Sequence, residues 1–288
     1  MFTNGTSSSI MNATYKFRGD TKMSNFLENS SYKPKYPVQT LGKALDVLIY
    51  IKNNASADGV SIAELSEYLN MGKSTVHRLL DTLLAYNFVE KTYANASYKL
   101  GWGIYDIGST VPFQHSLNNT NLSPLLEELC NECSETINFG IMNNNSVVIL
   151  YKAEPNIKIR ANVNIGGNEP FYCTAIGKLF LSSLSVQEVK EYFIHSDITN
   201  YTNNTITTAE KMIPELAKIA QNGYSIDNEE FYAGLICIAV PVYDYSGKIV
   251  AGISISGPSE RMVQKKIDDV LPKLKKSCEK LSVHFGYR

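Results

Sequence analysis

The chain has 288 residues, of which 44% are hydrophobic, a composition that favours a protein with two domains that each bury a core. No apolar run approaches the roughly 18 residues that a membrane span needs, and no signal-peptide core is present, so we expect a cytoplasmic protein without membrane partners. The formal net charge of −1 excludes whole-chain attraction to nucleic acid and leaves only local patches for that role.

Residues 1–35 are rich in Ser, Asn, Thr and Lys and poor in apolar periodicity, which predicts a disordered N-terminal extension. Cationic residues outnumber acidic ones in this segment, so it could follow DNA phosphates as an arm. The alternative is that translation begins at Met23 and that residues 1–22 do not belong to the natural protein.

Residues 36–101 have the pattern of a winged helix-turn-helix domain. A helix over 62–69, with Ser61 as its N-cap, is separated from a second helix by the turn-forming run Asn70-Met71-Gly72. An earlier helix adds a third apolar face, and residues 88–93 and 97–100 alternate like the strands of a hairpin that turns at 94–96. The apolar positions of the three helices are Leu41, Ala44, Leu45, Leu48 and Ile51; Ile62, Leu65 and Leu69; and Val76, Leu79, Leu80 and Leu83.

The helix that follows Gly72 has a polar face opposite its apolar stripe. That face offers a lysine, hydroxyls and an arginine, which are groups that bond phosphate oxygens and base edges. A helix-turn-helix places this helix in the major groove, so we predict DNA contacts by Lys73, Ser74, Thr75, His77, Arg78 and Thr82. Alternatively, this is the solvated face of an ordinary helical hairpin. Cationic and acidic residues over 36–100 are equal in number, which favours a dimer or a dimer of dimers whose modest half-site contacts add on a palindromic operator.

Residues 102–121 predict a linker helix followed by a polar linker. Residues 102–111 can form a short helix that ends before Pro112, and residues 113–121 are polar and rich in Asn. Trp102, Ile104, Tyr105 and Ile107 give the helix an apolar surface, which could pack against a second chain or only against its own domain.

In residues 122–288 the predicted strands come in hairpins and the helices in separate runs, which favours an antiparallel sheet flanked by helices, an α+β fold. Strands are predicted at 137–142, 146–151, 157–163, 225–227, 235–243 and 248–256, and a loop at 165–171. Helices are predicted at 123–134, from about 174 to 184, at 211–221 and at 260–281. Capping boxes at 185–188 and 207–210 should open two helices, with Gly223 ending the second.

The sequence contains no recognisable catalytic or metal-binding signature. Cys130 and Cys133 form a C-x-x-C pair, but no second Cys/His pair lies at zinc-finger spacing, and helical periodicity already accounts for Cys133 in a core. The histidines have no nucleophile in a known arrangement, and Cys237 lies in the apolar strand LICIAV. We therefore expect no enzyme activity, no metal and no cofactor.

Several ordered motifs resemble a single protein family. LGKALDVLIYI, ELSEYLNMGKSTVHRLLDTLLAYNFVEK and YKLGWGIYDIG resemble the DNA-binding half of the IclR (isocitrate lyase regulator) family of bacterial transcription factors. FYCTAIGKLFL, GYSIDNEEFYAGLICIAVPVYD and GKIVAGISISGP resemble the effector-binding half of the same family. The resemblance implies a GAF-like sensor domain, a linker helix that helps the chains dimerise, and effector contacts at Ala175, Ile176, Asp227, Leu235, Cys237, Ser254 and Ser256.

The residue types at these positions suit a small anionic ligand. A helix that starts near Ala175 offers free N–H groups from about Ala175 to Gly177, a site for a carboxylate or phosphate. A buried Asp227 could accept bonds from ligand hydroxyls, while Ser254 and Ser256 lie on one face of their strand and can donate. Each residue also has an ordinary structural explanation, namely capping, core packing or sheet hydrogen bonds.

Lys178 is expected on the exterior of its helix, which leaves these motifs without an obvious cationic clamp for a carboxylate. A small organic acid held by backbone N–H groups therefore ranks first, ahead of a sugar-acid derivative or an aromatic acid.

The hypothesis that unites these features is a homo-oligomeric, effector-responsive regulator that represses a catabolic operon. The effector would shift the relative placement of paired winged helices, which requires different affinities for the two placements. The alternative is a small-molecule-binding enzyme, or an adaptor, that uses its winged helix for protein contacts.

Overall fold

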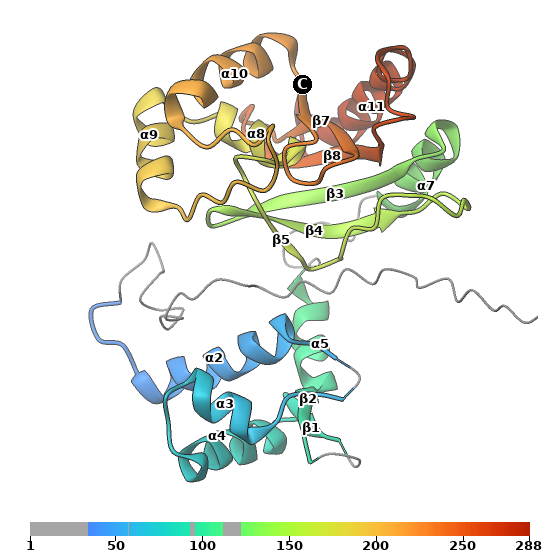
Figure 1. The fold of residues 1–288 in the computed structure, drawn as a ribbon. Coiled ribbons are helices and arrows are strands. Elements are labelled where there is room, and N and C mark those ends of the chain that lie inside the picture. Colours follow the sequence, from blue (N-terminus) through green and yellow to red (C-terminus); the bar gives the residue numbers. More distant parts are fainter. Residues whose placement is uncertain (1–33, 57, 93–95, 112–121) are drawn as a thin grey trace, which may run out of the picture. The chain divides into compact units, whose positions relative to one another are not determined.

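The computed structural model describes residues 34–56, 58–92, 96–111 and 122–288 (Figure 1). It divides into two compact units, residues 1–110 and 111–288. The predicted extension lies outside the described residues except for Pro34 and Lys35, and so do most of the hairpin turn and the polar linker over 112–121. Within the described ranges no helix combines the length and the apolar character needed to cross a membrane.

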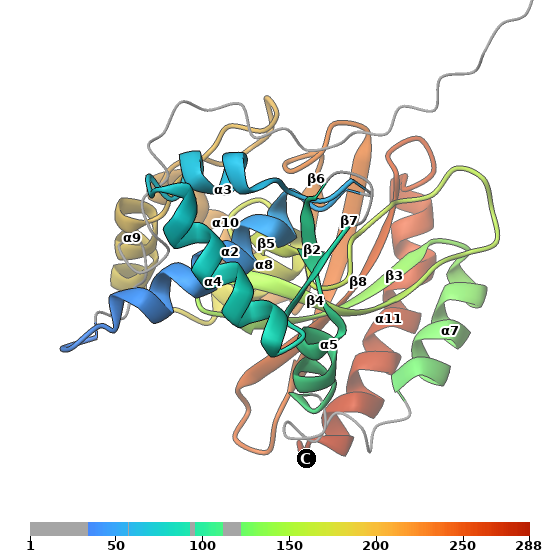
Figure 2. The same cartoon turned by 90° about the horizontal axis from the view of Figure 1, so that it is seen from below.

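The first unit contains the three helices and the hairpin of a winged helix-turn-helix (Figures 1 and 2). Its helices are α2 (Gln39–Asn53), α3 (Ile62–Tyr68) and α4 (Lys73–Ala85), followed by β1 (Val89–Lys91), β2 (Tyr98–Leu100) and α5 (Trp102–Ser109). Strands β1 and β2 pair antiparallel, and Val60 adds an isolated antiparallel bridge to Tyr98. The winged helix-turn-helix predicted from the sequence is confirmed.

Local sequence signals fix the start of α3 and the turn before α4. The Ser61 hydroxyl accepts a hydrogen bond from the Glu64 N–H, and the Glu64 carboxylate accepts one from the Ser61 N–H at 2.8 Å. This capping box satisfies two N–H groups that a helix start otherwise leaves unpaired. Asn70 then adopts a positive φ of 49°, a conformation that asparagine tolerates better than most residues.

The predicted buried face of α2 is partly right, since Ile51 is buried and Ala44 and Leu48 pack against the core, and partly wrong. Leu41 and Leu45 were assigned to the core but are 57% and 49% exposed, whereas Val47 and Ile51 are fully buried against α3 and α4. The segment LGKALDVLIYI has apolar residues around most of its circumference, so a helical period alone allows more than one buried face. Packing against Leu65, Val76 and Leu80 selects the face that carries Val47 and Ile51.

The second unit is a six-stranded antiparallel sheet with helices on both faces (Figure 1). The strands follow the order β5 (Asn168–Pro170), β4 (Ser146–Ala153), β3 (Thr136–Asn143), β8 (Ile249–Pro258), β7 (Leu235–Tyr243) and β6 (Ser225–Asn228). Helices α7 (Leu122–Cys133) and α11 (Gln264–His284) cover one face, and α8 (Ala175–Ser182) packs on the other with α9 (Val186–His195) and α10 (Ala209–Asn222) beyond it. The predicted α+β class is confirmed.

The segment before α8 was assigned wrongly. Residues 157–163 were predicted as a strand but have no regular structure, and β5 lies inside the predicted loop over 165–171. The apolar residues that suggested a strand include Ile159, which is 71% exposed. Side chains from elsewhere hold this segment instead: Thr136 donates to the Ala161 carbonyl at 3.0 Å, and Arg261 donates to the Ile159 carbonyl at 3.0 Å.

One of the two capping boxes predicted in this unit forms. Ser185 and Glu188 cap α9 reciprocally, as predicted. The pattern at 207–210 fails because the N-cap of α10 is Thr208, whose side chain makes no capping hydrogen bond, so Glu210 stands one position too early. Gly223 ends α10 with a positive φ of 70°, in agreement with its predicted role.

Two glycines set the position of α8 above the sheet. A Cβ atom on Gly140 would lie 3.1 Å from the Cδ1 atom of Ile176, and a Cβ on Gly252 would lie 3.0 Å from its Cγ2 atom. A side chain at either position would have to displace neighbouring side chains, which are Ile176 at both positions and also Val147 at Gly140. Because Gly140 on β3 and Gly252 on β8 have no side chains, the first turn of α8 can pack closely against the centre of the sheet.

Candidate nucleic-acid interface and ligand site

Helix α4 separates its apolar and polar residues completely. Val76, Leu79, Leu80 and Leu83 are buried in the core of the first unit. All six side chains predicted to contact DNA are exposed: Lys73, Ser74, Thr75, His77, Arg78 and Thr82. The N-cap, Gly72, offers no side chain to the helix start, and the Thr75 N–H donates to the Gly72 carbonyl, so the N–H groups of Lys73 and Ser74 are the ones that could meet a phosphate.

Two details modify the expected interface. The Thr82 hydroxyl donates to the Arg78 carbonyl of its own helix at 3.0 Å, so its proton is already engaged. On the hairpin, Lys99 pairs with Glu90 at 3.0 Å, which neutralises a cation of the wing locally. The strongest cationic groups left on this face of α4 are Lys73 and Arg78.

Helix α5 presents apolar side chains that its own unit does not cover. Trp102, Tyr105 and Ile107 are 75%, 69% and 58% exposed. Beside them, a groove of about 620 Å³ runs between α5, the end of α4 and β1, with Tyr86 and Phe88 on its other wall. The part of the first unit that the structure describes therefore leaves Trp102, Tyr105 and Ile107 exposed on α5.

Three of the predicted ligand residues lie side by side across the sheet. Asp227 on β6 stands opposite Cys237 on β7, and Cys237 stands opposite Ser256 on β8. Ser254 is on the same face one pleat further along, opposite Ala239. Ala239 and Cys237 pack in the core beneath α8, so this row faces the start of that helix. Leu235, half-buried at the beginning of β7, is on the same face one pleat beyond Cys237.

The start of α8 offers fewer N–H groups than the sequence suggested. Thr174 is the N-cap, and its hydroxyl oxygen accepts from the Gly177 N–H at 3.2 Å, so the expectation of a free group at Gly177 was wrong. The first backbone bond of the helix runs from the Lys178 N–H to the Thr174 carbonyl. The N–H groups of Ala175 and Ile176 come before it and are the ones that could meet an anion.

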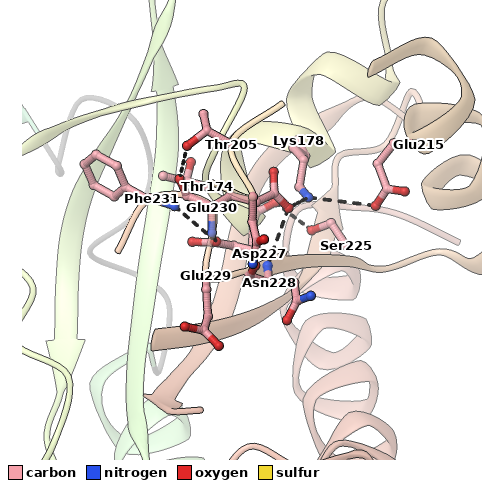
Figure 3. A network of polar contacts seen from close by, with 12 residues as sticks. Thr174, Lys178, Thr205, Glu215, Ser225, Asp227, Asn228, Glu229, Glu230 and Phe231 are labelled. Atoms are coloured by element: carbon pink, nitrogen blue, oxygen red, sulfur yellow. Dashed lines mark hydrogen bonds and ion pairs between the residues drawn. The ribbon is translucent and has the colours of Figure 1, made fainter. Parts of the chain in front are cut away.

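Asp227 is buried, with 2% of its surface exposed. Its Oδ1 atom accepts from the Glu230 N–H at 2.7 Å and from the Phe231 N–H at 3.4 Å, so it shapes the turn between β6 and β7 (Figure 3). Burial raises the pKa of this carboxyl to about 7 despite those two hydrogen bonds. The Oδ1 atom of Asp227 therefore stabilises this turn, whether or not the residue also contacts a ligand.

Lys178 is fully buried, which contradicts its predicted place on the helix exterior. Figure 3 shows its side chain directed at Glu230, with which it forms an ion pair, and at Glu215, whose Oε1 atom lies 3.8 Å from its Nζ atom. Helix α8 lies between the sheet and α10, and all residues from Ala175 to Leu181 are buried, so the helix has no exterior face. A lysine in such a helix needs a buried partner. The apolar residues around Lys178 in FYCTAIGKLFL were the sequence signal that could have predicted its burial.

Sequence reasoning missed two polar residues beside this row. Asn138, on the neighbouring strand β3, is buried and donates through its Nδ2 atom to the hydroxyls of Ser254 at 3.2 Å and Ser256 at 3.1 Å. Glu169, on β5, is half-buried, and burial raises its pKa to about 7. A polar residue inside the apolar strand TINFGIM was a signal for Asn138, whereas Glu169 fell in a segment taken for a loop.

The cysteine thiols of the second unit lie in its interior. Burial raises the pKa of the Cys237 thiol well above its ordinary range, and the nearby Asp227 carboxylate adds to this effect. Cys130 and Cys133 are buried free thiols on α7. Over the described ranges, no three Cys, His, Asp or Glu side chains come together in an arrangement that could hold a metal ion.

Two family models match the chain, one in each unit. The model described as the IclR helix-turn-helix domain matches residues 40–92, and the one described as the bacterial transcriptional regulator IclR C-terminal matches residues 115–283. The chain belongs to the IclR family. This IclR-family protein is therefore a helix-turn-helix transcriptional regulator with the family's effector-binding C-terminal domain, as predicted.

Similar proteins agree with this assignment. The IclR-family chain is 33% identical over 232 residues to the HTH-type transcriptional regulator KdgR of Escherichia coli (strain K12), covering 79% of this chain and 86% of the relative. It is 34% identical over 256 residues to the DNA-binding transcriptional repressor YiaJ of the same organism, covering 86% and 88%. The crystal structure of the Thermotoga maritima IclR is 30% identical, with a TM-score of 0.66 and coverage of 87% of this chain and 100% of that chain.

Proposed function

We propose that this regulator represses a catabolic operon by binding a palindromic operator, and that a small acid bound in the C-terminal unit controls that binding. The observation that carries the DNA half of the proposal is the wholly exposed polar face of α4. Lys73 and Arg78 would contact phosphates and base edges, with Ser74, Thr75 and His77 between them and Thr82 at the far end. The relative named as a repressor supports this sign of regulation.

The effector would bind beneath the first turn of α8. The N–H groups of Ala175 and Ile176 would hold its carboxylate, with Asp227, Cys237, Ser254 and Ser256 around it and Leu235 at the rim. Because Lys178 is committed to Glu230, the negative charge would be met by backbone dipoles and hydroxyls instead of a cation. This arrangement favours a small organic acid or sugar acid.

The active form would be a homodimer or a homotetramer in the cytoplasm. The exposed side chains of Trp102, Tyr105 and Ile107 supply an apolar surface that a second chain could cover. Two linked winged helices would bind the two halves of a palindrome with a gain in effective concentration, which offsets the weak net charge of each domain. We propose that the protein acts without catalysis, since its named relatives are regulators.

Footprinting of the purified protein on DNA upstream of its own gene and its neighbours tests the proposal. A panel of small organic and sugar acids would be added to each reaction. Protection of a palindrome that one acid relieves is the expected result. In the Asp227→Ala variant we expect the same protection without relief by the acid. If nothing is protected under any condition, the DNA half of the proposal fails and the adaptor or enzyme alternative gains support.

A further inference from the structure

Asn138 on β3 leaves half of its amide unused. The residue is 2% exposed, and both hydrogen bonds recorded for its side chain come from the Nδ2 atom, toward Ser254 and Ser256. The Oδ1 atom is buried and has no hydrogen-bond partner among the described residues. A buried acceptor that has given up water without gaining a donor is destabilising, and native proteins nearly always provide one.

The unused oxygen lies in the floor of the proposed effector site. The sheet register places Asn138 opposite Ser254, which stands opposite Ala239, and Ala239 packs in the core under α8. Asn138 is therefore on the same face as the polar row and not on the face covered by α7 and α11. Gly140, two residues along the same face, lies under Ile176, which marks the start of α8.

The hydrogen bonds already present determine what this floor can offer to a ligand. Since Ser254 and Ser256 accept from Asn138, the Ser254 hydroxyl keeps its proton to donate to a ligand, whereas the Ser256 hydroxyl also bonds the Cys237 thiol. The N–H groups of Ala175 and Ile176 are donors too. The site thus has several donors, which suit a carboxylate, and one buried neutral acceptor, which requires a donor on the ligand.

We propose that the Oδ1 atom of Asn138 accepts a hydrogen bond from a hydroxyl group of the effector, and that the effector is consequently a hydroxy acid. Asn138 is then a specificity-determining residue that separates hydroxylated acids from acids lacking the hydroxyl. The inference rests on the proposed effector site beneath α8. A site built to bond a hydroxyl rejects the analogue without it, because the buried acceptor is then left unpaired.

Calorimetric titration of the full chain with pairs of acids that differ by one hydroxyl tests this inference. Suitable pairs are lactate and propionate, glycerate and lactate, and 4-hydroxybenzoate and benzoate. In at least one pair we expect the hydroxylated acid to bind about tenfold tighter or more. Asn138→Leu should weaken only that acid and bring the two affinities together. Asn143→Leu, at the exposed end of the same strand, should leave the difference intact.

Each remaining outcome has a definite meaning. Asn138→Ala, which adds no bulk, provides the same comparison if circular dichroism shows that Asn138→Leu does not fold. Equal affinities within every pair that binds, or a difference that survives in both Asn138 variants, would overturn the inference. If, in that case, the acids that bind the native chain no longer bind Asp227→Ala, the proposed effector site beneath α8 is retained and only the role of Asn138 is rejected. If no acid of any pair binds, the inference and the proposed ligand class fail together, while footprinting still tests the DNA half.

Discussion

The polar face of α4 and the polar row beneath α8 differ in how the chain assembles them. The residues of α4 come from one helix, and the helical period separates an exposed polar side from a buried apolar side. The row beneath α8, together with Asn138 and the start of α8, joins residues of β3, β6, β7, β8 and a helix that are far apart in the sequence, and nearly all of them are buried. Local sequence determines the first surface, whereas sheet register determines the second.

This difference predicts how each region should respond to substitution. On α4, a side chain that only water touches can be removed without disturbing the core, so the effect should appear in DNA binding alone. Beneath α8, the same groups hold the turn between β6 and β7 together, so substitutions should change stability as well as ligand binding. Variants in both regions can therefore show whether DNA binding and stability respond independently.

The largest effect is expected from Lys178→Met. It removes the buried cation and leaves Glu230 without its partner, which should lower the free energy of unfolding of the second unit by about 3–5 kcal/mol. Urea unfolding measures this loss, and Lys190→Met on the exposed side of α9 is the matched control. The double variant Lys178→Met/Glu230→Leu should recover much of the loss. Equal stability of Lys178→Met and the control would show that the pair contributes nothing.

Arg78→Ala should reduce operator affinity by about 1–3 kcal/mol, the usual range for a side chain that reads a base edge. The melting temperature of the first unit should not change, because the side chain is exposed. Gel-shift titration beside thermal unfolding separates the two effects, and Lys190→Ala controls for the loss of one positive charge. Unchanged affinity would remove Arg78 from the interface.

A pH dependence should distinguish Asp227 from any group on α4. Its pKa is raised to about 7, so the folded state holds a proton that the unfolded state has released. Stability contributed by this carboxyl is present at acid pH and is lost as pH rises from about 4 to 7, with a slope of up to about 1.4 kcal/mol per pH unit. Asp227→Asn should flatten that slope in unfolding measured from pH 4 to 8. A slope that persists in the variant would have to come from other carboxyls whose pKa is raised by burial, such as Glu169 and Glu230.

The same contrast explains which features could be predicted from the sequence. Helices α3 and α4, their turn and the cap at Ser61 follow from spacing and residue type within short windows, and they were predicted correctly. Lys178 was misplaced because its helix is sandwiched between the sheet and α10, a fact of tertiary packing that no local window contains. Asn138 was missed because its importance comes from Ser254 and Ser256, more than 100 residues away but adjacent in register.

Leu41 and Leu45 show a further reason why the sequence alone did not predict every buried residue. A helix with apolar residues on several sides can turn more than one face toward a core, and the choice is made by the partners. The segment 157–163 has the composition of a strand, but the donors that hold it are side chains of Thr136 and Arg261, which no strand pattern reveals.

The smallest effect is expected from Thr82→Val. This variant tests whether every exposed residue on the polar face of α4 contacts DNA. The Thr82 hydroxyl already donates to the Arg78 carbonyl, and the substitution keeps the shape of the side chain. We expect operator affinity to change by less than about 0.5 kcal/mol, whereas Ser74→Ala, at the free start of the helix, should weaken binding more. Gel-shift titration of both variants makes the comparison. If Thr82→Val proves the more damaging variant, the DNA contacts extend further along α4 than its first turn, and the cation at Arg78 acts together with the hydroxyl beside it.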